Sequence, residues 1–183
     1  APVKGASPTM SFDGPVTADM QLKPTLAGSA VRSVSGKIDL DASQLKVEMK
    51  GGVFHKTEAM PLSVHASFEG NDTETLLKGL DVQFTDYKLH GRGRITLDPM
   101  AAKVEVETDT GSVRLDKVQT FVPMAAAYHL KGVADFKLDL DWKPEALHAS
   151  GDLGVSDGAF FLKDLLKAPM GFRIKAGFSE SSL

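Results

Sequence analysis

Four basic side chains that alternate along one stretch are the residues best spaced to do chemistry. Lys88, His90, Arg92 and Arg94 occupy every second position of "YKLHGRGRIT". Such a row could hold a phosphate, a lipid headgroup or a nucleic-acid backbone. Alternating charge is more typical of the solvated face of a β-strand, and acidic partners follow in the sequence. We therefore favour a salt-bridged outer face over an anion site.

The residue types that bind metals or cofactors are present but poorly arranged. The five histidines are too far apart in sequence to have the spacing of metal ligands: His55, His65, His90, His129 and His148. The acidic row Asp135, Asp139 and Asp141 lies on a continuing strand and not in a glycine-centred calcium loop. "GRGRIT" lacks the third glycine of a dinucleotide fingerprint and precedes a strand. The sequence predicts no metal and no cofactor.

Nucleophilic catalysis has equally little support. The chain contains no cysteine, so it has neither a thiol nucleophile nor a disulfide framework. A G-x-S-x-G elbow is also absent. The sequon "NDT" at 71–73 is a frequent chance match. We expect a protein that is not an enzyme and has no catalytic residues.

Composition limits the possible partners and the extent of the chain. The 183 residues carry a net charge of −3, which gives no general attraction to nucleic acid or to an anionic membrane. No stretch approaches the ~20 apolar residues of a membrane-spanning helix. The first residues, "APVKGASPTMSFDGP", lack the features of a signal peptide. We interpret residues 1–183 as one β-rich segment excised from a longer protein.

Period-two alternation of apolar and polar residues dominates the chain and predicts strands. Gly, Pro, Asp and Asn clusters such as "GND" and "DPM" separate them. The predicted strands are 17–22, 36–41, 44–50, 61–69, 80–85, 87–97, 103–109, 132–142, 147–155 and 171–178. Three stretches are candidates for short helices: 72–78, 116–122 and 161–167. The fold class expected is mainly β, an antiparallel meander of hairpins with two or three short helices.

An internal repeat suggests two copies of one hairpin. "GKIDLDASQLKVEMK" at 36–50 aligns without gaps on "GRITLDPMAAKVEVE" at 93–107. In the second copy, we pair Ile95 with Val104, which sets Arg94 against Glu105 and Arg92 against Glu107. The equivalent pairing in the first copy sets Asp39 against Lys46 and Lys37 against Glu48. Opposite charges across a ladder contribute roughly 0.2–1 kcal/mol a pair. The registers therefore predict one apolar face and one charged face.

The apolar face of such a sheet must be covered, and two arrangements are open. A second sheet would give a packed sandwich, which physical reasoning alone favours. A curved one-sided sheet would instead form a β-groove that shares its lining with a ligand. The apolar positions contain no interleaved polar group to orient a small molecule, which suits an acyl chain better than a specific metabolite.

The order of the sequence pieces resembles the periplasmic region of AsmA-family proteins of Gram-negative bacteria. The pieces are "MQLKPTLAGSAVRSVSGKIDLDASQLKVEMKGG", "MPLSVHASFEG", "LLKGLDVQFTDYKLHGRGRITLDP", "KVEVETDTGSVRLDKVQTFVP" and "LKGVADFKLDLDWKPEALHASGDLGVSDGAFFLKDLLKAPM". The resemblance covers the chain from about residue 17 onward. It consists of strand and turn patterns and carries over no functional residue.

The resemblance implies a β-rich body in the periplasm, tethered to the inner membrane by an anchor outside these residues. It also implies a repeating β-groove, related to bridge-like lipid transfer proteins, that shields phospholipid or fatty acyl chains in transit or serves outer-membrane biogenesis. The alternative is a structural or interaction β-sandwich of a secreted or surface protein without a lipid ligand. The lipid-groove candidates are Leu80, Val82, Phe84, Ile95, Leu97, Val104, Val106, Phe136, Leu138, Leu140 and Trp142.

Overall fold

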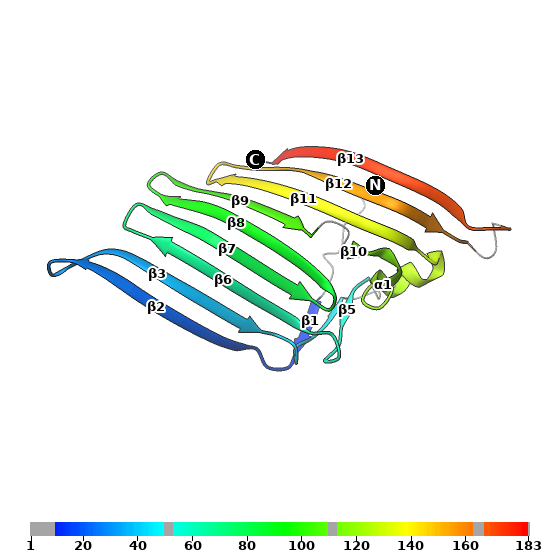
Figure 1. Ribbon diagram of the computed structural model, residues 1–183, viewed down its shortest axis with the longest axis horizontal. Helices are drawn as coiled ribbons and strands as arrows, with labels where there is room; N and C mark the ends of the chain where they lie inside the picture. Colours follow the sequence, from blue (N-terminus) through cyan, green and yellow to red (C-terminus); the bar gives the residue numbers. More distant parts are fainter. Residues whose placement is uncertain (1–9, 50–52, 110–112, 163–166, 183) are drawn as a thin grey trace, which may run out of the picture.

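A computed structural model of the protein describes residues 10–49, 53–109, 113–162 and 167–182. Most of them lie in one antiparallel sheet with the order β13-β12-β11-β9-β8-β7-β6-β3-β2. The strands on this path are β2 (Thr17–Ala27), β3 (Ala30–Asp41), β6 (Leu62–Gly70), β7 (Glu74–Phe84), β8 (Tyr87–Leu97), β9 (Met100–Thr108), β11 (Lys131–Lys143), β12 (Ala146–Phe160) and β13 (Met170–Ser182). Figure 1 shows them side by side in one open sheet. The predicted antiparallel meander is confirmed.

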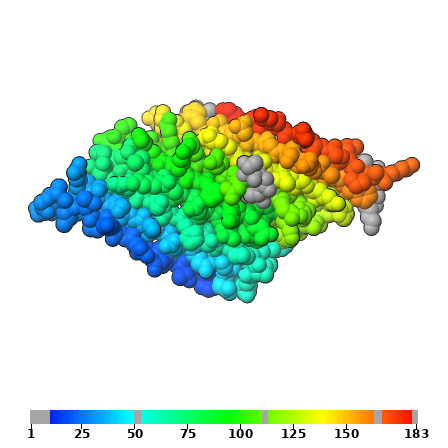
Figure 2. Space-filling view, in the orientation of Figure 1, coloured from blue at the N-terminus to red at the C-terminus, as the bar shows by residue number. Residues whose placement is uncertain are grey.

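The strands follow one another along the sheet in chain order. Each strand pairs with its sequence neighbour in the main sheet, and Figure 2 accordingly shows the sequence colours succeeding one another from blue to red across the molecule. Short polar turns make this possible, because antiparallel neighbours need only a few connecting residues. The hairpin turns of β2–β3, β6–β7, β8–β9 and β11–β12 all lie at the same end of the strands (Figure 1). We call this the hairpin end.

The opposite end of the sheet carries the remaining elements. A small sheet contains β1 (Met10–Asp13), β4 (Lys46–Met49) and β5 (His55–Lys56) in the order β1-β4-β5. The two-residue strand β10 (Val113–Arg114) pairs with β11 and leads into α1 (Leu115–Val118) and the 3-10 helix η1 (Pro123–Tyr128). Figure 1 shows β1, β5 and α1 together at this end. We call it the capped end.

An aromatic cluster joins the capped end to the main sheet. The ring of Phe121 lies 5.1 Å from that of Phe84, 5.4 Å from that of Tyr87 and 6.1 Å from that of Phe54. The first two pairs meet edge to face, a favoured geometry for aromatic rings. The Tyr87 hydroxyl donates a hydrogen bond of 2.8 Å to the backbone oxygen of Arg114. The loop after α1 is therefore held against the turn between β7 and β8.

We expect the stability of the protein to fall at alkaline pH because of Tyr87. Burial raises the pKa of its phenol to about 12, and the carboxylates of Asp116 and Asp86 add to the shift. The unfolded chain releases this proton near pH 10. Between pH 10 and 12 the free energy of unfolding should therefore decrease, by at most about 1.4 kcal/mol per pH unit. Denaturant unfolding at pH 9 to 11.5 should show this slope in the wild type and a shallower one in Tyr87→Phe. Parallel curves for the two proteins would contradict the assignment.

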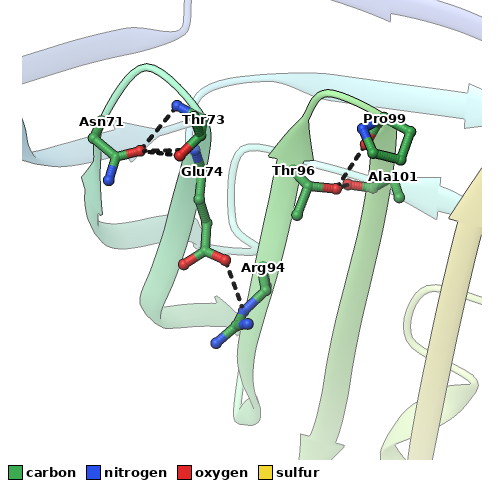
Figure 3. A network of polar contacts seen from close by, with 7 residues as sticks. All are labelled: Asn71, Thr73, Glu74, Arg94, Thr96, Pro99 and Ala101. Carbon is green, nitrogen blue, oxygen red and sulfur yellow. Dashed lines mark hydrogen bonds and ion pairs between the residues drawn. The ribbon is translucent and has the colours of Figure 1, made fainter.

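The helix expected at 72–78 is wrong. These residues form the turn after β6 and the start of β7. The side-chain oxygen of Asn71 accepts hydrogen bonds of 2.9 Å from the backbone N–H groups of Thr73 and Glu74 and from the Thr73 hydroxyl (Figure 3). Asparagine satisfies backbone donors in this way in tight turns as well as at helix starts. In this chain the side chain of Asn71 therefore stabilises a tight turn and not the start of a helix.

The other two expected helices have different outcomes. Only the first part of 116–122 is helical, because α1 ends at Val118 and the chain continues through turns into η1. Of the stretch 161–167, residues 163–166 lie outside the described residues, and residues 161, 162 and 167 are not helical.

The first copy of the repeat is not a hairpin, which corrects the pairing of Asp39 with Lys46 and of Lys37 with Glu48. β3 pairs with β2 and β6, whereas β4 belongs to the small sheet. Asp39 instead contacts His65, with 2.5 Å between Oδ1 and Nδ1. The Lys46 ammonium lies 2.8 Å from the Glu58 carboxylate. The turn at 42–45 therefore sends the chain into a second sheet.

The second copy is the β8–β9 hairpin, but its register differs from the predicted one by two residues. A two-residue turn sets Leu97 opposite Met100, so that Gly93 faces Val104 and Arg92 faces Glu105. Arg94 then lies opposite Lys103 and not Glu105. Its Nε is 3.3 Å from a Glu74 carboxylate oxygen on β7 (Figure 3). The shift conserves the faces of the sheet, because it is an even number of residues.

The described residues form hardly any closed core. The buried apolar side chains are Val47, Tyr87, Ala125, Ala134 and Val155. The accessible surface is 12677 Å² for 19.6 kDa. A compact monomer of this mass would expose roughly 8,600 Å². The second sheet among the described residues is the three-stranded β1-β4-β5 sheet at the capped end, and large apolar side chains along the main sheet are exposed. The packed sandwich that physical reasoning favoured is therefore wrong.

Candidate functional site

The face of the main sheet that carries apolar side chains is the candidate site. Cross-strand pairing aligns one residue from each of nine strands in a row that we call the central row. Every member is apolar or glycine: Met20, Ile38, Ala66, Leu80, Gly91, Val106, Leu138, Gly151 and Phe178. Nine strands at a spacing of about 4.8 Å span about 38 Å. An uninterrupted apolar row therefore crosses the whole sheet.

Rows on either side of the central row have the same character. Toward the hairpin end, the next row is apolar from β2 to β12 and ends at a charged residue on β13: Leu22, Gly36, Phe68, Leu77, Gly93, Val104, Leu140, Ala149 and Glu180. Toward the capped end, the corresponding row contains Ala18, Leu40, Val64, Val82, Leu89, Thr108, Phe136, Leu153 and Ala176. The Thr108 hydroxyl oxygen accepts a hydrogen bond of 3.0 Å from the Phe136 backbone N–H. The Thr108 hydroxyl is thus satisfied by the sheet itself, and the charged residue of these rows, Glu180, lies on the edge strand β13.

The sequence-predicted lining residues come together on this face. Leu80, Val106 and Leu138 lie in the central row, and the others share the same side of their strands. The flanking rows hold Val82, Val104, Phe136 and Leu140, while Ile95, Leu97 and Trp142 lie nearer the hairpin end. Phe84 differs, because its ring packs in the aromatic cluster at the capped end.

Two aromatic rings of the lining lie over glycines of neighbouring strands. A methyl group at Gly36 would meet the ring of Phe68 at 2.5 Å, and one at Gly151 would meet that of Phe178 at 3.0 Å. Each ring therefore occupies the space that a side chain on the neighbouring strand would fill. The rings lie low across the sheet, which keeps the apolar face shallow and continuous.

The lining is open to solvent at both edges of the sheet. On β2, Met20 is 62% and Leu22 57% exposed, and on β13 Phe178 is 50% exposed. Inner positions such as Val82 and Leu138 are half-buried. Contiguous exposed apolar surfaces of this kind are uncommon on folded monomers. The open sheet with its exposed apolar face is consistent with a groove.

The opposite face carries the charges, and three members of its basic row, His90, Arg92 and Arg94, contact carboxylates. Arg92 Nε lies 2.7 Å from Glu105, and Arg94 contacts Glu74. Lys103 extends the network to Asp141 at 3.1 Å. Lys88, the fourth member of the row, lies opposite Gln83. The preference for a salt-bridged outer face over an anion site is therefore supported, although both predicted pairs are wrong, because Arg92 contacts Glu105 and not Glu107, and Arg94 contacts Glu74 and not Glu105.

His90 lies between two carboxylates on this charged face. Its Nδ1 is 2.5 Å from Asp81 and its Nε2 is 3.0 Å from Asp109. The hydrogen bond with Asp81, together with the negative charge of Asp109, raises the pKa of His90. Both ring nitrogens are used in these contacts. His90 therefore works as a cross-strand link between β7, β8 and the end of β9.

Sequence reasoning underestimated the outer strands. The eleven predicted lining residues all come from β7, β8, β9 and β11. The face continues through β12 and β13 on one side and through β6, β3 and β2 on the other. Alternation such as "RIKAGF" at 173–178 carried the signal for β13. The sequence did not predict how these strands pair, and it is this pairing that joins their apolar sides into one surface.

Within residues 10–49, 53–109, 113–162 and 167–182, no three His, Asp or Glu side chains are grouped closely enough to hold a metal ion. No helix in this part of the chain has the length and apolar character needed to cross a membrane. No protein-family model matches the sequence, and neither the curated proteins nor the solved structures contain a significant match. The candidate site therefore rests on its geometry.

Proposed function

We propose that the protein is a non-enzymatic module that shields lipid acyl chains on the apolar face of its open sheet. The observation that carries this proposal is the apolar surface itself, which crosses nine strands with no second layer over it in the described residues. Removing a CH₂ group from water is worth ~0.8 kcal/mol. A chain of several methylenes laid on this surface gains stabilisation from each of them.

The chemistry of the surface suits transit better than tight retention. The central row repeats small and medium apolar residues, and it has no polar group that would fix one ligand in one place. Binding is then a series of similar weak contacts from strand to strand. A lipid tail held in this way can move along the row without breaking one strong interaction.

The resemblance to the AsmA family extends the proposal to the cell envelope. In this proposal the chain is a periplasmic segment of a Gram-negative protein, tethered to the inner membrane by an anchor outside these residues. Its cargo is phospholipid or fatty acid, and its role lies in lipid transport or outer-membrane biogenesis. An open sheet with one apolar side supports this assignment, since a lipid groove requires such a surface.

The test is a pair of charges placed on the lining. Val82→Asp combined with Leu138→Asp puts two carboxylates in adjacent apolar rows, three strands apart in the sheet. Burying an unpaired carboxylate against an acyl chain is costly. We expect binding of a pyrene-labelled fatty acid to weaken at least tenfold. Native mass spectrometry of protein purified without detergent should likewise find lipid on the wild type and not on this variant.

A matched control keeps the added charge and changes the face. Gln83→Asp combined with Ala101→Asp adds two carboxylates on the charged side, because Gln83 faces Lys88 and Ala101 faces Thr96. This variant should bind the fatty acid as the wild type does. The proposal fails if the wild type carries no lipid and binds no fatty acid, or if both variants lose binding equally. Capture of an apolar peptide without any fatty-acid binding would point to a protein-interaction surface instead.

A further inference from the structure

We infer that a hollow at the hairpin end of the apolar face receives the headgroup of a zwitterionic phospholipid. Arg32 contacts the phosphate of this headgroup, and Asp72 contacts its ammonium. The inference rests on the proposed function, because the acyl chains of the same lipid lie on the apolar rows beside the hollow. It adds a position for the headgroup and a preference among phospholipids.

The hollow lies where β3 extends past its neighbour β6. The ladder between these two strands ends at the pair of Val34 and Gly70, whereas β3 begins at Ala30. Figure 1 shows the β2–β3 hairpin reaching beyond the β6–β7 hairpin at this end. The hollow between β3 and the β6–β7 turn has a volume of about 360 Å³, which lies within the range of small-molecule sites. Its size therefore suits a lipid headgroup.

The apolar side of the hollow is continuous with the lining of the candidate site. Val31, Val34 and Phe68 border the hollow, and Val31 is 60% exposed. Phe68 also belongs to the row next to the central row, opposite Leu77 of β7. The members of both rows that neighbour Phe68 are apolar or glycine. An acyl chain attached to a headgroup in the hollow can therefore pass directly onto the apolar face.

The polar side of the hollow carries one positive and one negative charge. These are Arg32 and Asp72, and both side chains are exposed. Neither side chain forms a hydrogen bond or an ion pair with another of the residues that the structure describes. Arg92 and Arg94 on the charged face, in contrast, contact carboxylates. The two charges of the hollow are therefore available to a ligand.

A zwitterionic headgroup satisfies both charges at once. The guanidinium of Arg32 can donate a pair of parallel hydrogen bonds to a phosphate. The carboxylate of Asp72 accepts a hydrogen bond from the ammonium, which a short linker joins to that phosphate. An anionic headgroup satisfies Arg32 as well, but it brings its negative charge near Asp72 without an ammonium. The hollow therefore favours a zwitterionic phospholipid over an anionic one.

The backbone holds both charged residues in place beside the hollow. Arg32 is the extra residue of a β-bulge, because its two neighbours on β3 pair with the consecutive residues Thr25 and Leu26 of β2. A bulge of this kind re-aims a side chain. Asp72 lies in the β6–β7 turn, where the side-chain oxygen of Asn71 accepts hydrogen bonds from the backbone N–H groups of the two residues that follow Asp72 (Figure 3). A fixed backbone on both sides lowers the entropy that is lost when the headgroup binds.

Selection of lipids from a mixture tests the inference. Delipidated protein is incubated with vesicles that contain equal amounts of phosphatidylethanolamine, phosphatidylglycerol and diacylglycerol with the same acyl chains. Mass spectrometry then measures the lipids on the re-isolated protein. The wild type should carry roughly threefold to fivefold more phosphatidylethanolamine than phosphatidylglycerol, since exposed ion pairs are weak. Asp72→Asn should bring this ratio close to one, and Arg32→Gln should lower both phospholipids relative to diacylglycerol by a similar factor.

Arg173→Gln and Asp98→Asn are the matched controls, because they make the same changes at exposed positions outside the hollow. Both should select lipids as the wild type does. Diacylglycerol has no charged headgroup, so its binding reports the apolar rows alone. If the wild type binds diacylglycerol but does not discriminate between the two phospholipids, or if the Arg32 and Asp72 variants leave the selection unchanged, the inference is wrong and the proposed function stands. If the wild type binds none of the three lipids, the proposed function is wrong and the inference falls with it.

Discussion

Replacing Lys56 by methionine should lower the free energy of unfolding by about 3 kcal/mol. Lys56 is the one side chain of its size that is fully buried among the described residues, at 1% exposure. Its ammonium donates to the backbone oxygens of Leu45 at 2.6 Å, Ser43 at 2.9 Å and Thr57 at 3.3 Å. All three donors of the group are therefore used. Methionine conserves the length of the side chain and leaves three carbonyls without a donor.

The position of Lys56 explains why the cost is large. The carbonyls of Ser43 and Leu45 belong to the turn that leads from the main sheet into the small sheet. Burial lowers the pKa of Lys56, and the charges of Asp41 and Glu58 oppose this shift. The buried amine thus fixes the turn that separates β3 from β4. Without it, we expect the small sheet to detach from the capped end before the main sheet unfolds.

Lys46→Met is the control for this prediction. Lys46 is half-exposed, and its ammonium contacts Glu58 at 2.8 Å and Asp13 at 4.0 Å on the surface. Exposed ion pairs contribute about 1 kcal/mol or less. Denaturant unfolding of both variants, followed by circular dichroism, should show a shift at least twice as large for Lys56→Met. Equal shifts would mean that the buried hydrogen bonds do not contribute as described.

Gly132→Ala should destabilise the protein by about 2–4 kcal/mol. Gly132 has a φ of +111°, a conformation that residues with a side chain rarely adopt. A methyl group there would lie 2.8 Å from the Cα atom of Gly158 and 2.8 Å from the backbone oxygen of Ser156. Both neighbours are backbone atoms and cannot rotate away. The irregular start of the β11–β12 ladder therefore requires glycine.

Gly154→Ala is the matched control, because it makes the same chemical change on the partner strand. No atom lies within 4 Å of the position that its methyl group would occupy. This change should be neutral or stabilising by up to about 1 kcal/mol, since alanine restricts the unfolded chain. Thermal unfolding of the two variants should shift in opposite directions or leave Gly154→Ala unchanged. A similar loss in both would show that the ladder does not depend on the backbone at Gly132.

Strand positions and faces were predictable because alternation records them locally. The predicted strand 87–97 coincides with β8, and the lining residues of β7, β8, β9 and β11 fall on one face as expected. Registers were less accessible, because they depend on turn length. The turn at Asp98 and Pro99 uses two residues, so Arg92 and not Arg94 faces Glu105. In both registers of the β8–β9 hairpin an arginine faces Glu105, so the charge pattern did not distinguish them.

Errors in topology came from interactions that are distant in sequence. The stretch 36–50 has the same alternation as a true hairpin. Its two strands nevertheless pair elsewhere, β3 with β6 and β4 with β1. The turn between β3 and β4 is held by Lys56, whose aliphatic stem and charge gave no sequence signal of burial. Similarly, the long strands of the described residues all pair into one sheet, so none of them forms a second layer over it. Alternation alone is equally compatible with a sandwich.

The meander has a consequence for how such a protein can change in length. Each long strand is in contact with its immediate neighbours in the sheet, and the ladder repeats from β2 to β13. Cohesion is then a chain of nearest-neighbour couplings, as in solenoid proteins. Adding or deleting a hairpin would widen or narrow the apolar face by two strands. The contacts between the remaining strands would stay the same. Evolution can thus change the width of this sheet one hairpin at a time.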